Sequence, residues 1–136
     1  MIVYTDSLAG ITPDHLRGGF FVGWPNPPTP ESHLHLLAGS NQVFLACDDQ
    51  TGQVVGFITA ITDGVLAAYI PLLEVLPAYQ GRGIGSELTR RMLATLRDLY
   101  MVDLLCDPDR QPFYARLGMR PATGMLLRHY DRQSGV

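Results

Sequence analysis

With 136 residues, 46% of them apolar, the chain can bury one hydrophobic core, and we expect a single domain over residues 1–136. The net charge of −3 gives no reason to expect a nucleic-acid partner, which a basic surface would favour. No apolar run approaches the roughly 20 residues that span a bilayer, and the first ten residues lack the features of a signal peptide. We therefore expect a cytoplasmic protein without a membrane partner, in which Cys47 and Cys106 are reduced thiols.

The first 40 residues predict one strand and two short helices. Residues 2–5 have the pattern of a strand, and Thr12 followed by Pro13 is typical of a helix start. Four prolines in residues 24–30 exclude regular structure there. Thr29 and Pro30 repeat the helix-start signal, so a second helix is expected to end at Gly39.

An antiparallel meander should follow. Residues 42–47 and 53–62 are predicted strands joined by a hairpin loop, and Asp63-Gly64 predicts a second tight turn. Residues 65–76 are apolar almost throughout, which favours a central strand covered on both faces. Pro71 cannot donate a hydrogen bond within a sheet, so we expect a bulge or an opening at that position.

The second half predicts a crossover. Apolar residues recur at helical spacing from Ile84 to Leu99, and residues 101–106 have the pattern of a strand that would be parallel to the preceding one. Residues 111–118 predict a short helix, and residues 124–130 a last strand that closes the sheet. The fold class is α+β: a meander that leads into one parallel crossover.

Three glycines, at positions 81, 83 and 85, lie where the apolar strand passes into the helix. Glycine is costly in conformational entropy, so its repeated use needs a reason. One interpretation is simply a tight turn. A dinucleotide-binding fingerprint is another, but the spacing puts Ser86 or Leu88 at its last glycine, and a long meander precedes the loop.

The third interpretation is Gln80-x-x-Gly83-x-Gly85, which resembles the acyl-CoA loop of the GNAT family of N-acetyltransferases. The resemblance covers roughly residues 40–130, including "LLEVLPAYQGRGIG" and "PFYARLGM", which is similar to the family's "FYEKLGF" helix. It implies the GNAT acyl-CoA N-acyltransferase fold (α+β, also described as α/β), in which helices flank a mixed central sheet that splays after a bulged strand. It also implies acetyl transfer from acetyl-CoA directly to a primary amine.

The resemblance assigns the acetyl-CoA site. Backbone N–H groups from Arg82 to Ser86 would surround the pyrophosphate at a helix N-terminus, where glycine allows a close approach. Leu73 and Val75 match strand positions whose backbone pairs with pantetheine and the thioester carbonyl. The complete expected set is Leu73, Val75, Gln80, Gly81, Arg82, Gly83, Ile84, Gly85, Ser86 and Asp107.

Three charged positions leave alternatives open. Arg90 or Arg91 would either approach the nucleotide 3′-phosphate or belong to a solvated helix face. Asp107 stands where family members often carry an asparagine that helps to hold pantetheine, and an ionised carboxylate cannot donate a hydrogen bond. It could equally cap a strand end.

Two residues match catalytic positions of the family. An alkyl ammonium is only about one part in 10³ neutral at pH 7, so Glu74 would deprotonate the amine; the alternative is an acid that merely orients a cationic substrate or caps a neighbouring group. Tyr114 would protonate the departing CoA thiolate, since a phenol is protonated at neutral pH. Its alternative is a tyrosine of the hydrophobic core.

The acceptor side is less defined. Phe20, Phe21 and Trp24 would line an apolar acceptor pocket or simply pack an N-terminal lobe. The four histidines form no metal motif, because His33 and His35 would point to different faces of a helix. We expect a small-molecule or protein amine as acceptor and no metal; homodimers are common in the family. A catalytically silent module that binds CoA or acyl-CoA as a sensor or partner is the alternative function.

Overall fold

The computed structural model describes residues 1–136 and contains a mixed five-stranded sheet in the order β1-β2-β3-β4-β5. Neighbouring strands are antiparallel except β4 and β5, which are parallel. The strands are β1 (Ile2–Thr5), β2 (Gln42–Asp48), β3 (Val54–Thr62), β4 (Ala67–Val75) and β5 (Met101–Asp103). The α-helices are α1 (Pro30–Gly39), α2 (Ile84–Thr95) and α3 (Gln111–Ala115).

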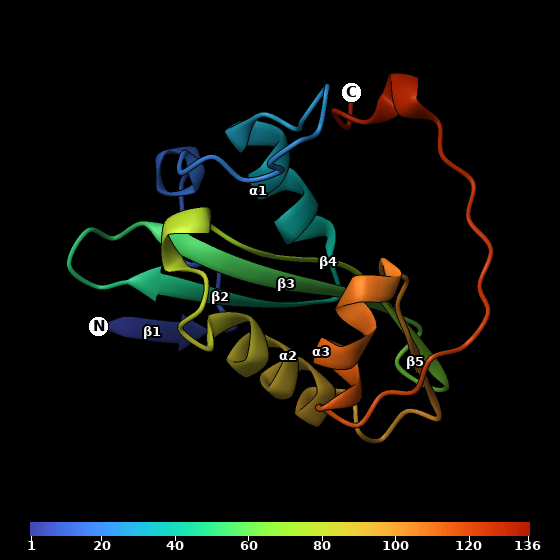
Figure 1. The fold of residues 1–136 in the computed structure, drawn as a ribbon. Helices are drawn as coiled ribbons and strands as arrows, with labels where there is room; N and C mark the ends of the chain where they lie inside the picture. The colour runs from blue at the N-terminus through green and yellow to red at the C-terminus, as the bar shows by residue number, and fades with distance from the viewer.

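Helices cover both faces of the sheet, so the chain forms three layers (Figure 1). One core cluster joins sheet residues to the apolar side of α2, which contributes Ile84, Leu88 and Met92. The second cluster joins the opposite face to the N-terminal lobe, defined here as residues 6–39, through buried residues such as Leu16 and Leu37. α2 and the lobe therefore hold the sheet between them.

The structure confirms several element boundaries that local sequence signals predicted. The Thr29 hydroxyl accepts a hydrogen bond from the Ser32 N–H at 3.1 Å, so it caps α1 as predicted. In the turn between β3 and β4, Asp63 Oδ1 accepts bonds from the N–H groups of residues 65–67, and Gly64 has a φ of +74°. The helix predicted from Pro13 is a single 3₁₀ turn, Pro13–Leu16.

The expected bulge lies on β4 at Pro71. Thr59 pairs with Leu72, but Ile61 pairs with Tyr69, so β4 holds one more residue than β3 between these pairs. β5 is paired with β4 only over residues 67–69. Beyond Tyr69, on the far side of the bulge, β4 has no neighbour on that side, and the sheet is splayed there, as the resemblance implies.

The prediction that residues 65–76 form a central strand covered on both faces is confirmed only in part, because β4 lies between β3 and β5 but is not covered on both faces. β3 occupies the centre of the sheet, and its residues 54–60 are all buried. In β4 only Ala68 and Ile70 are buried, and the strand has a neighbour on both sides only over residues 67–69. An apolar run marks burial, but the position within the sheet depends on which strands pair.

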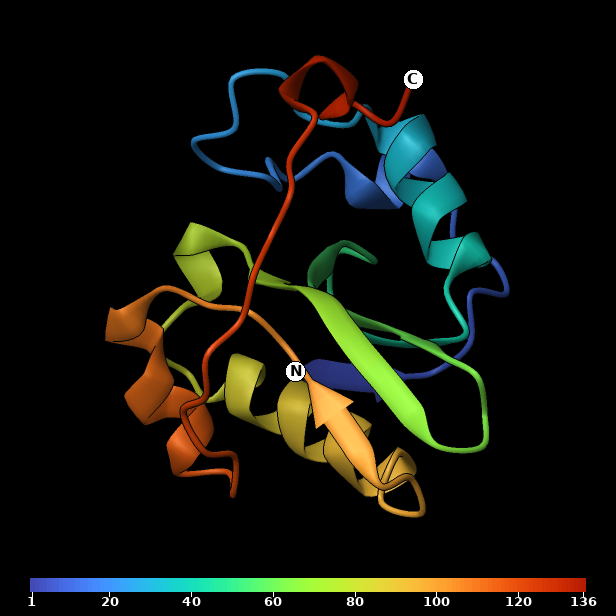
Figure 2. The ribbon, with the colours of Figure 1, turned by 90° about the vertical axis from the view of Figure 1, so that its right-hand side faces the viewer.

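The prediction that residues 124–130 form a strand that closes the sheet is wrong. Gly118, with a φ of +101°, ends the turn after α3, and residues 119–136 then form what we call the C-terminal arm. The arm crosses in front of the molecule towards the N-terminal lobe without joining the sheet (Figure 2). A strand needs a partner for its backbone groups, and none lies beside the arm.

Candidate active site

The glycine loop lies between the end of β4 and the start of α2. Gly81 and Gly83 have φ values of +77° and +80°, a region that side chains other than glycine rarely adopt. A Cβ on either residue would meet no atom within 4 Å, so the backbone faces open space. The Gln80 amide donates to the Val75 carbonyl at 3.0 Å and ties the loop to the strand.

The loop ends in a group of free backbone donors. Glu87 is the first residue of α2 whose N–H group donates a hydrogen bond in the helical pattern, to the carbonyl four residues earlier, that of Gly83, at 3.0 Å. The N–H groups of Ile84, Gly85 and Ser86 precede it and have no such partner, as at any helix N-terminus. Together with the helix dipole, these donors suit an anion such as a phosphate.

Gly85 brings three elements of the expected site together. Its φ is ordinary, but an added Cβ would lie 3.7 Å from Phe113 Cζ and 3.8 Å from Val75 Cγ2. The start of α2, the end of β4 and α3 therefore meet at this residue. The Phe113 ring in turn packs edge-on against the Tyr114 ring, with centroids 4.9 Å apart. The expected residues Val75, Gly85 and Tyr114 thus belong to one contiguous region.

Tyr114 is half-buried, and its hydroxyl makes no hydrogen bond within the chain. Burial raises the pKa of its phenol above 10, with a further rise from Cys106 and an opposing effect from Arg110. The phenol therefore keeps its proton at neutral pH and has it free to donate. Tyr114 also lines a groove of about 960 Å³ between β5, α3 and the start of the C-terminal arm.

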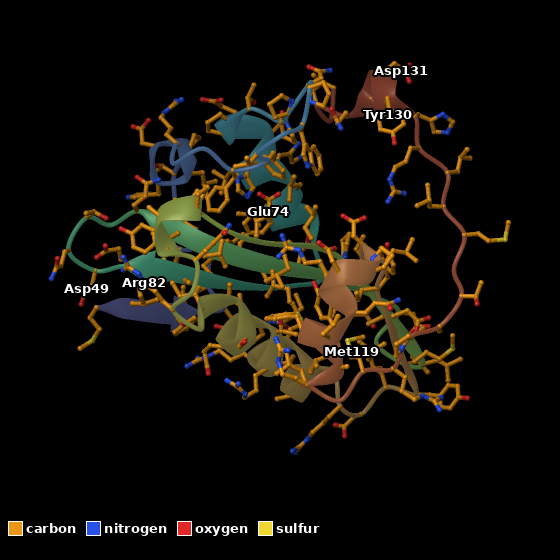
Figure 3. The ribbon with its side chains drawn as sticks, in the orientation of Figure 1. Asp49, Glu74, Arg82, Met119, Tyr130 and Asp131 are labelled. Carbon is orange, nitrogen blue, oxygen red and sulfur yellow. The ribbon has the colours of Figure 1, made fainter.

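Glu74 lies on β4 beyond the last residue that pairs with β5. Its Oε1 accepts a hydrogen bond from the Phe21 N–H at 2.8 Å, so the carboxylate faces the N-terminal lobe (Figure 3). Burial raises the pKa of Glu74 above its ordinary value of 4.5, and the bond from Phe21 opposes that rise. A carboxylate with a raised pKa is a stronger base than one in water.

The aromatic residues of the lobe pack around a buried histidine. The rings of Phe20, Phe21 and Phe57 lie with their centroids 4.5–5.2 Å from that of His33. Phe20, Phe21 and His33 also line a cleft of about 330 Å³. Trp24 packs on Phe21 at 4.9 Å but does not line the cleft, so it belongs to the packing of the lobe.

The environment of His33 could not be predicted from the sequence pattern. Its side chain is 1% exposed, its Nε2 has no hydrogen-bond partner, and burial lowers its pKa to about 4. The helical spacing did predict that His33 and His35 lie on different faces, and His35 is exposed. Only the contacts between lobe and sheet reveal that the buried face is aromatic.

The arginines contact groups of the protein itself. Arg82 Nη2 donates to the Ala78 carbonyl at 3.3 Å, and its guanidinium lies 5.0 Å from the centroid of the Tyr79 ring. Figure 3 shows Arg82 at the same end of the molecule as Asp49. Arg90 and Arg91 each bind the Glu87 carboxylate at 2.8 Å, as the alternative of a solvated helix face predicts.

The remaining expected residues differ in their surroundings. Leu73 pairs with Ile58 on β3, whereas Asp107 is exposed and its side chain makes no hydrogen bond. Cys47 and Cys106 are free thiols. The structure contains no group of three or more histidine, cysteine or acidic side chains placed to bind a metal. None of its helices combines the length and apolar character needed to cross a membrane.

The family model described as "Acetyltransferase (GNAT) family" matches residues 12–119 of the chain. A solved protein of Deinococcus radiodurans R1, assigned as an acetyltransferase, is 52% identical and superposes with a TM-score of 0.95. That alignment covers 99% of this chain, and so includes the C-terminal arm, and 93% of the other. A GNAT family acetyltransferase of Streptococcus pneumoniae is 30% identical, with a TM-score of 0.73 and coverage of 95% and 98%.

Curated relatives match over shorter stretches. GCN5-related N-acetyltransferase 3, chloroplastic, of Arabidopsis thaliana is 44% identical over 69 residues, which make up 49% of this chain and 29% of that protein. The matched parts span between 29% and 58% of the length of the first curated relatives. The similarity therefore concerns a part of those proteins rather than their whole length.

Proposed function

The chain belongs to the GNAT family of acetyltransferases, and from this membership we propose that it transfers an acetyl group from acetyl-CoA directly to a primary amine. The glycine loop carries the proposal. Gly81 and Gly83 leave open space where a side chain would otherwise stand, and the free N–H groups of α2 follow immediately. This arrangement fits the pyrophosphate of CoA, whose oxygens need several donors.

Further residues would hold the rest of the cosubstrate. The backbone of β4 around Leu73 and Val75 has no neighbouring strand on the β5 side, so it remains available to pantetheine and to the thioester carbonyl. A fixed N–H group directed at that carbonyl would stabilise the negative charge that develops on its oxygen. Acetyl-CoA supplies the activated acetyl group; the chain supplies orientation and proton transfer.

Glu74 and Tyr114 divide the proton transfers between them. Glu74 takes the proton of the ammonium group, and the neutral nitrogen forms a bond to the acetyl carbon as the bond from that carbon to sulfur breaks. Tyr114 donates its phenolic proton to the departing thiolate. The nitrogen then loses its second proton to solvent and becomes the neutral amide, and solvent returns a proton to the Tyr114 phenolate and removes that of Glu74. The raised pKa values of both groups support these roles, since Glu74 becomes a stronger base and Tyr114 stays protonated.

The cleft of about 330 Å³ in the N-terminal lobe is the proposed entrance for the acceptor; Glu74 does not line it but is bonded to Phe21, which does. Phe20 and Phe21 line it, and the N–H of Phe21 binds the carboxylate directly. An amine with an apolar or aromatic body would contact these rings while its nitrogen approaches Glu74. A small molecule and a protein amine both meet this description.

Binding is tested by thermal unfolding with acetyl-CoA and, as a control, with NAD. A ligand at about 100 times its Kd stabilises the folded state by roughly 2.7 kcal/mol, a shift of several degrees for a domain of this size. We expect a shift with acetyl-CoA alone. The absence of a shift at millimolar acetyl-CoA would mean that the glycines serve only the turn.

Turnover is tested by the release of free CoA thiol in the presence of a panel of amines. Asp107 favours the alternative of a silent binding module, because it is exposed and cannot replace a donor to pantetheine. Such a module would bind acetyl-CoA and release no thiol with any amine. An enzyme would release thiol in step with acetylated amine, which mass spectrometry identifies.

A further inference from the structure

The buried ring of His33 has no polar partner within the chain. Its side chain is 1% exposed and its Nε2 makes no hydrogen bond. Burial alone lowers its pKa to about 4, so no charged or hydrogen-bonding group of the protein acts on the ring, which is neutral at pH 7. A neutral imidazole offers one donor and one acceptor. Buried polar groups are nearly always paired, so an unpaired one needs a reason.

The surroundings of the ring make a single bound water a poor explanation. The rings of Phe20, Phe21 and Phe57 lie around His33, with centroids 4.5–5.2 Å away. A buried water needs about two to four polar partners, which aromatic rings do not supply. The partner that fits these surroundings is a polar group attached to an apolar body.

His33 also lines the cleft of about 330 Å³ in the N-terminal lobe, a volume at the small end of ligand sites. The one charged side chain of the cleft is Arg17, which Asp14 binds at 2.8 Å and Glu31 at 3.1 Å. The other lining residues are glycine, proline, leucine and phenylalanine. A carboxylate would find no free cation there, so the cleft favours an apolar ligand whose polar group beside His33 is uncharged.

Phe21 connects His33 to the proposed reaction site. Its N–H donates to Glu74 Oε1 at 2.8 Å, while its ring lies with its centroid 5.0 Å from that of His33. The carboxylate and the unpaired imidazole are therefore separated by the backbone and ring of one residue. A single small molecule can reach both groups.

We propose that His33 determines acceptor specificity: the preferred acceptor is a small arylalkylamine with a hydroxyl group, which binds the His33 ring while the amine lies at Glu74. This inference rests on the proposed acetyl transfer and names the acceptor class for the same site. A hydroxyl can donate or accept, so it complements either tautomer of the imidazole. An amine without the hydroxyl would leave the ring unpaired, and a site built to bind a substrate hydroxyl rejects such an analogue.

Phe20 is the side chain that admits this ligand. It is half-buried, lines the cleft and lies edge-on to His33 at 5.2 Å. Nε2 is covered in the structure, so the Phe20 ring turns aside and the aromatic ring of the acceptor takes its place against His33. Changes of side-chain rotamer are common when a ligand binds.

Steady-state kinetics with matched amines tests the specificity. The probes are phenethylamine and its 3-hydroxy and 4-hydroxy derivatives, each with saturating acetyl-CoA. We expect the wild type to prefer a hydroxylated amine over phenethylamine by about 10–10²-fold in kcat/KM. The variant His33→Phe keeps an aromatic ring among aromatic rings and should lose this preference. The matched control His35→Phe, at an exposed position of the same helix, should keep it.

Two results would overturn the proposal: no preference in the wild type, or the same preference in His33→Phe. The first comparison uses wild-type protein alone, so it holds even if the variant folds poorly. A wild type that acetylates lysine peptides and none of the three amines would also overturn it.

Calorimetry of the same amines, with and without CoA, separates this inference from the proposed function. We expect the hydroxylated amine to bind the wild type more tightly than phenethylamine does, and the difference to vanish in His33→Phe. If this difference appears but no amine is acetylated, the acetyl transfer is wrong and the selectivity of the cleft stands. If amines are acetylated without any effect of the hydroxyl, the transfer stands and the role of His33 is wrong.

Discussion

The backbone N–H of Phe21 donates a hydrogen bond to the carboxylate of Glu74 at 2.8 Å, across 53 positions of sequence. Phe21 has a φ of +63° and is the only residue other than glycine with a positive φ. A bulky side chain in that region costs of order 1–3 kcal/mol and persists only where surrounding contacts impose it. Here the imposed conformation directs an N–H group at the proposed catalytic base.

Replacing Glu74 by glutamine should separate its two roles. The glutamine carbonyl can still accept the Phe21 N–H, so we expect the melting temperature to change little. Removal of the base should lower kcat/KM by about 10²–10⁴-fold, the usual contribution of general acid–base catalysis. Steady-state kinetics and thermal unfolding of the same samples measure both effects.

The pH profile gives a second readout for Glu74. The wild type should lose activity as the pH falls through the raised pKa of the carboxyl group, above 4.5, because the base becomes protonated. That part of the acid limb should be missing in Glu74→Gln. Undiminished turnover in this variant would leave the acid with a role only in orienting the substrate.

Tyr114→Phe should lower kcat with almost no change in acetyl-CoA affinity, since the ring remains and only the hydroxyl is lost. Phe113 retains its edge-on contact with the substituted ring, so the fold should be kept. Calorimetry measures the affinity and thiol release the turnover. Equal turnover in variant and wild type would assign Tyr114 to packing alone.

Gly83→Val should abolish acetyl-CoA binding, because a β-branched side chain would enter the space left for the pyrophosphate. Gly10→Val is a matched control, since Gly10 has a φ of +78° and equally open surroundings. Both variants should lose about 1–2 kcal/mol of stability from backbone strain. Only Gly83→Val should lose the thermal shift with acetyl-CoA; a retained shift would place the phosphate site elsewhere.

His33 should make the protein less stable in mild acid. Its pKa is lowered from 6.5 to about 4 in the folded state, so the unfolded chain binds the proton first. Stability is then lost as the pH falls from about 6.5 towards 4, at about 1.4 kcal/mol per pH unit and about 3 kcal/mol at most.

Denaturant unfolding at several pH values, compared with His33→Gln, isolates this contribution. Glu74 acts in the opposite direction: its pKa is raised on folding, so it stabilises below about 4.5 and that stability is lost as the pH rises. The difference between wild type and variant removes this shared effect. Parallel pH curves for the two proteins would contradict the prediction for His33.

The features that sequence reasoning predicted well depend on neighbours along the chain. Thr29 caps α1 three residues ahead, Asp63 and Gly64 close a turn, and Pro71 interrupts the hydrogen bonding of its own strand. The glycine loop is a feature of the same kind, because the positive φ at Gly83 is a requirement of its own backbone turn. Such signals have the same meaning whatever surrounds them.

The features that could not be predicted from the sequence depend on contacts between residues that lie far apart along the chain. An apolar run at 65–76 cannot reveal that β3 takes the centre of the sheet, since strand order follows from pairing. The bond between Phe21 and Glu74 and the burial of His33 arise only when the lobe packs on the sheet.

The C-terminal arm shows most clearly the difference between what the local sequence determines and what tertiary contacts determine. Its sequence alone determined that residues 124–130 are suited to a strand, through their apolar content and spacing. Only the tertiary structure decided that this strand has no partner within its own chain, because a strand exists through hydrogen bonds to a neighbour and the arm leads away from the free edge of β5.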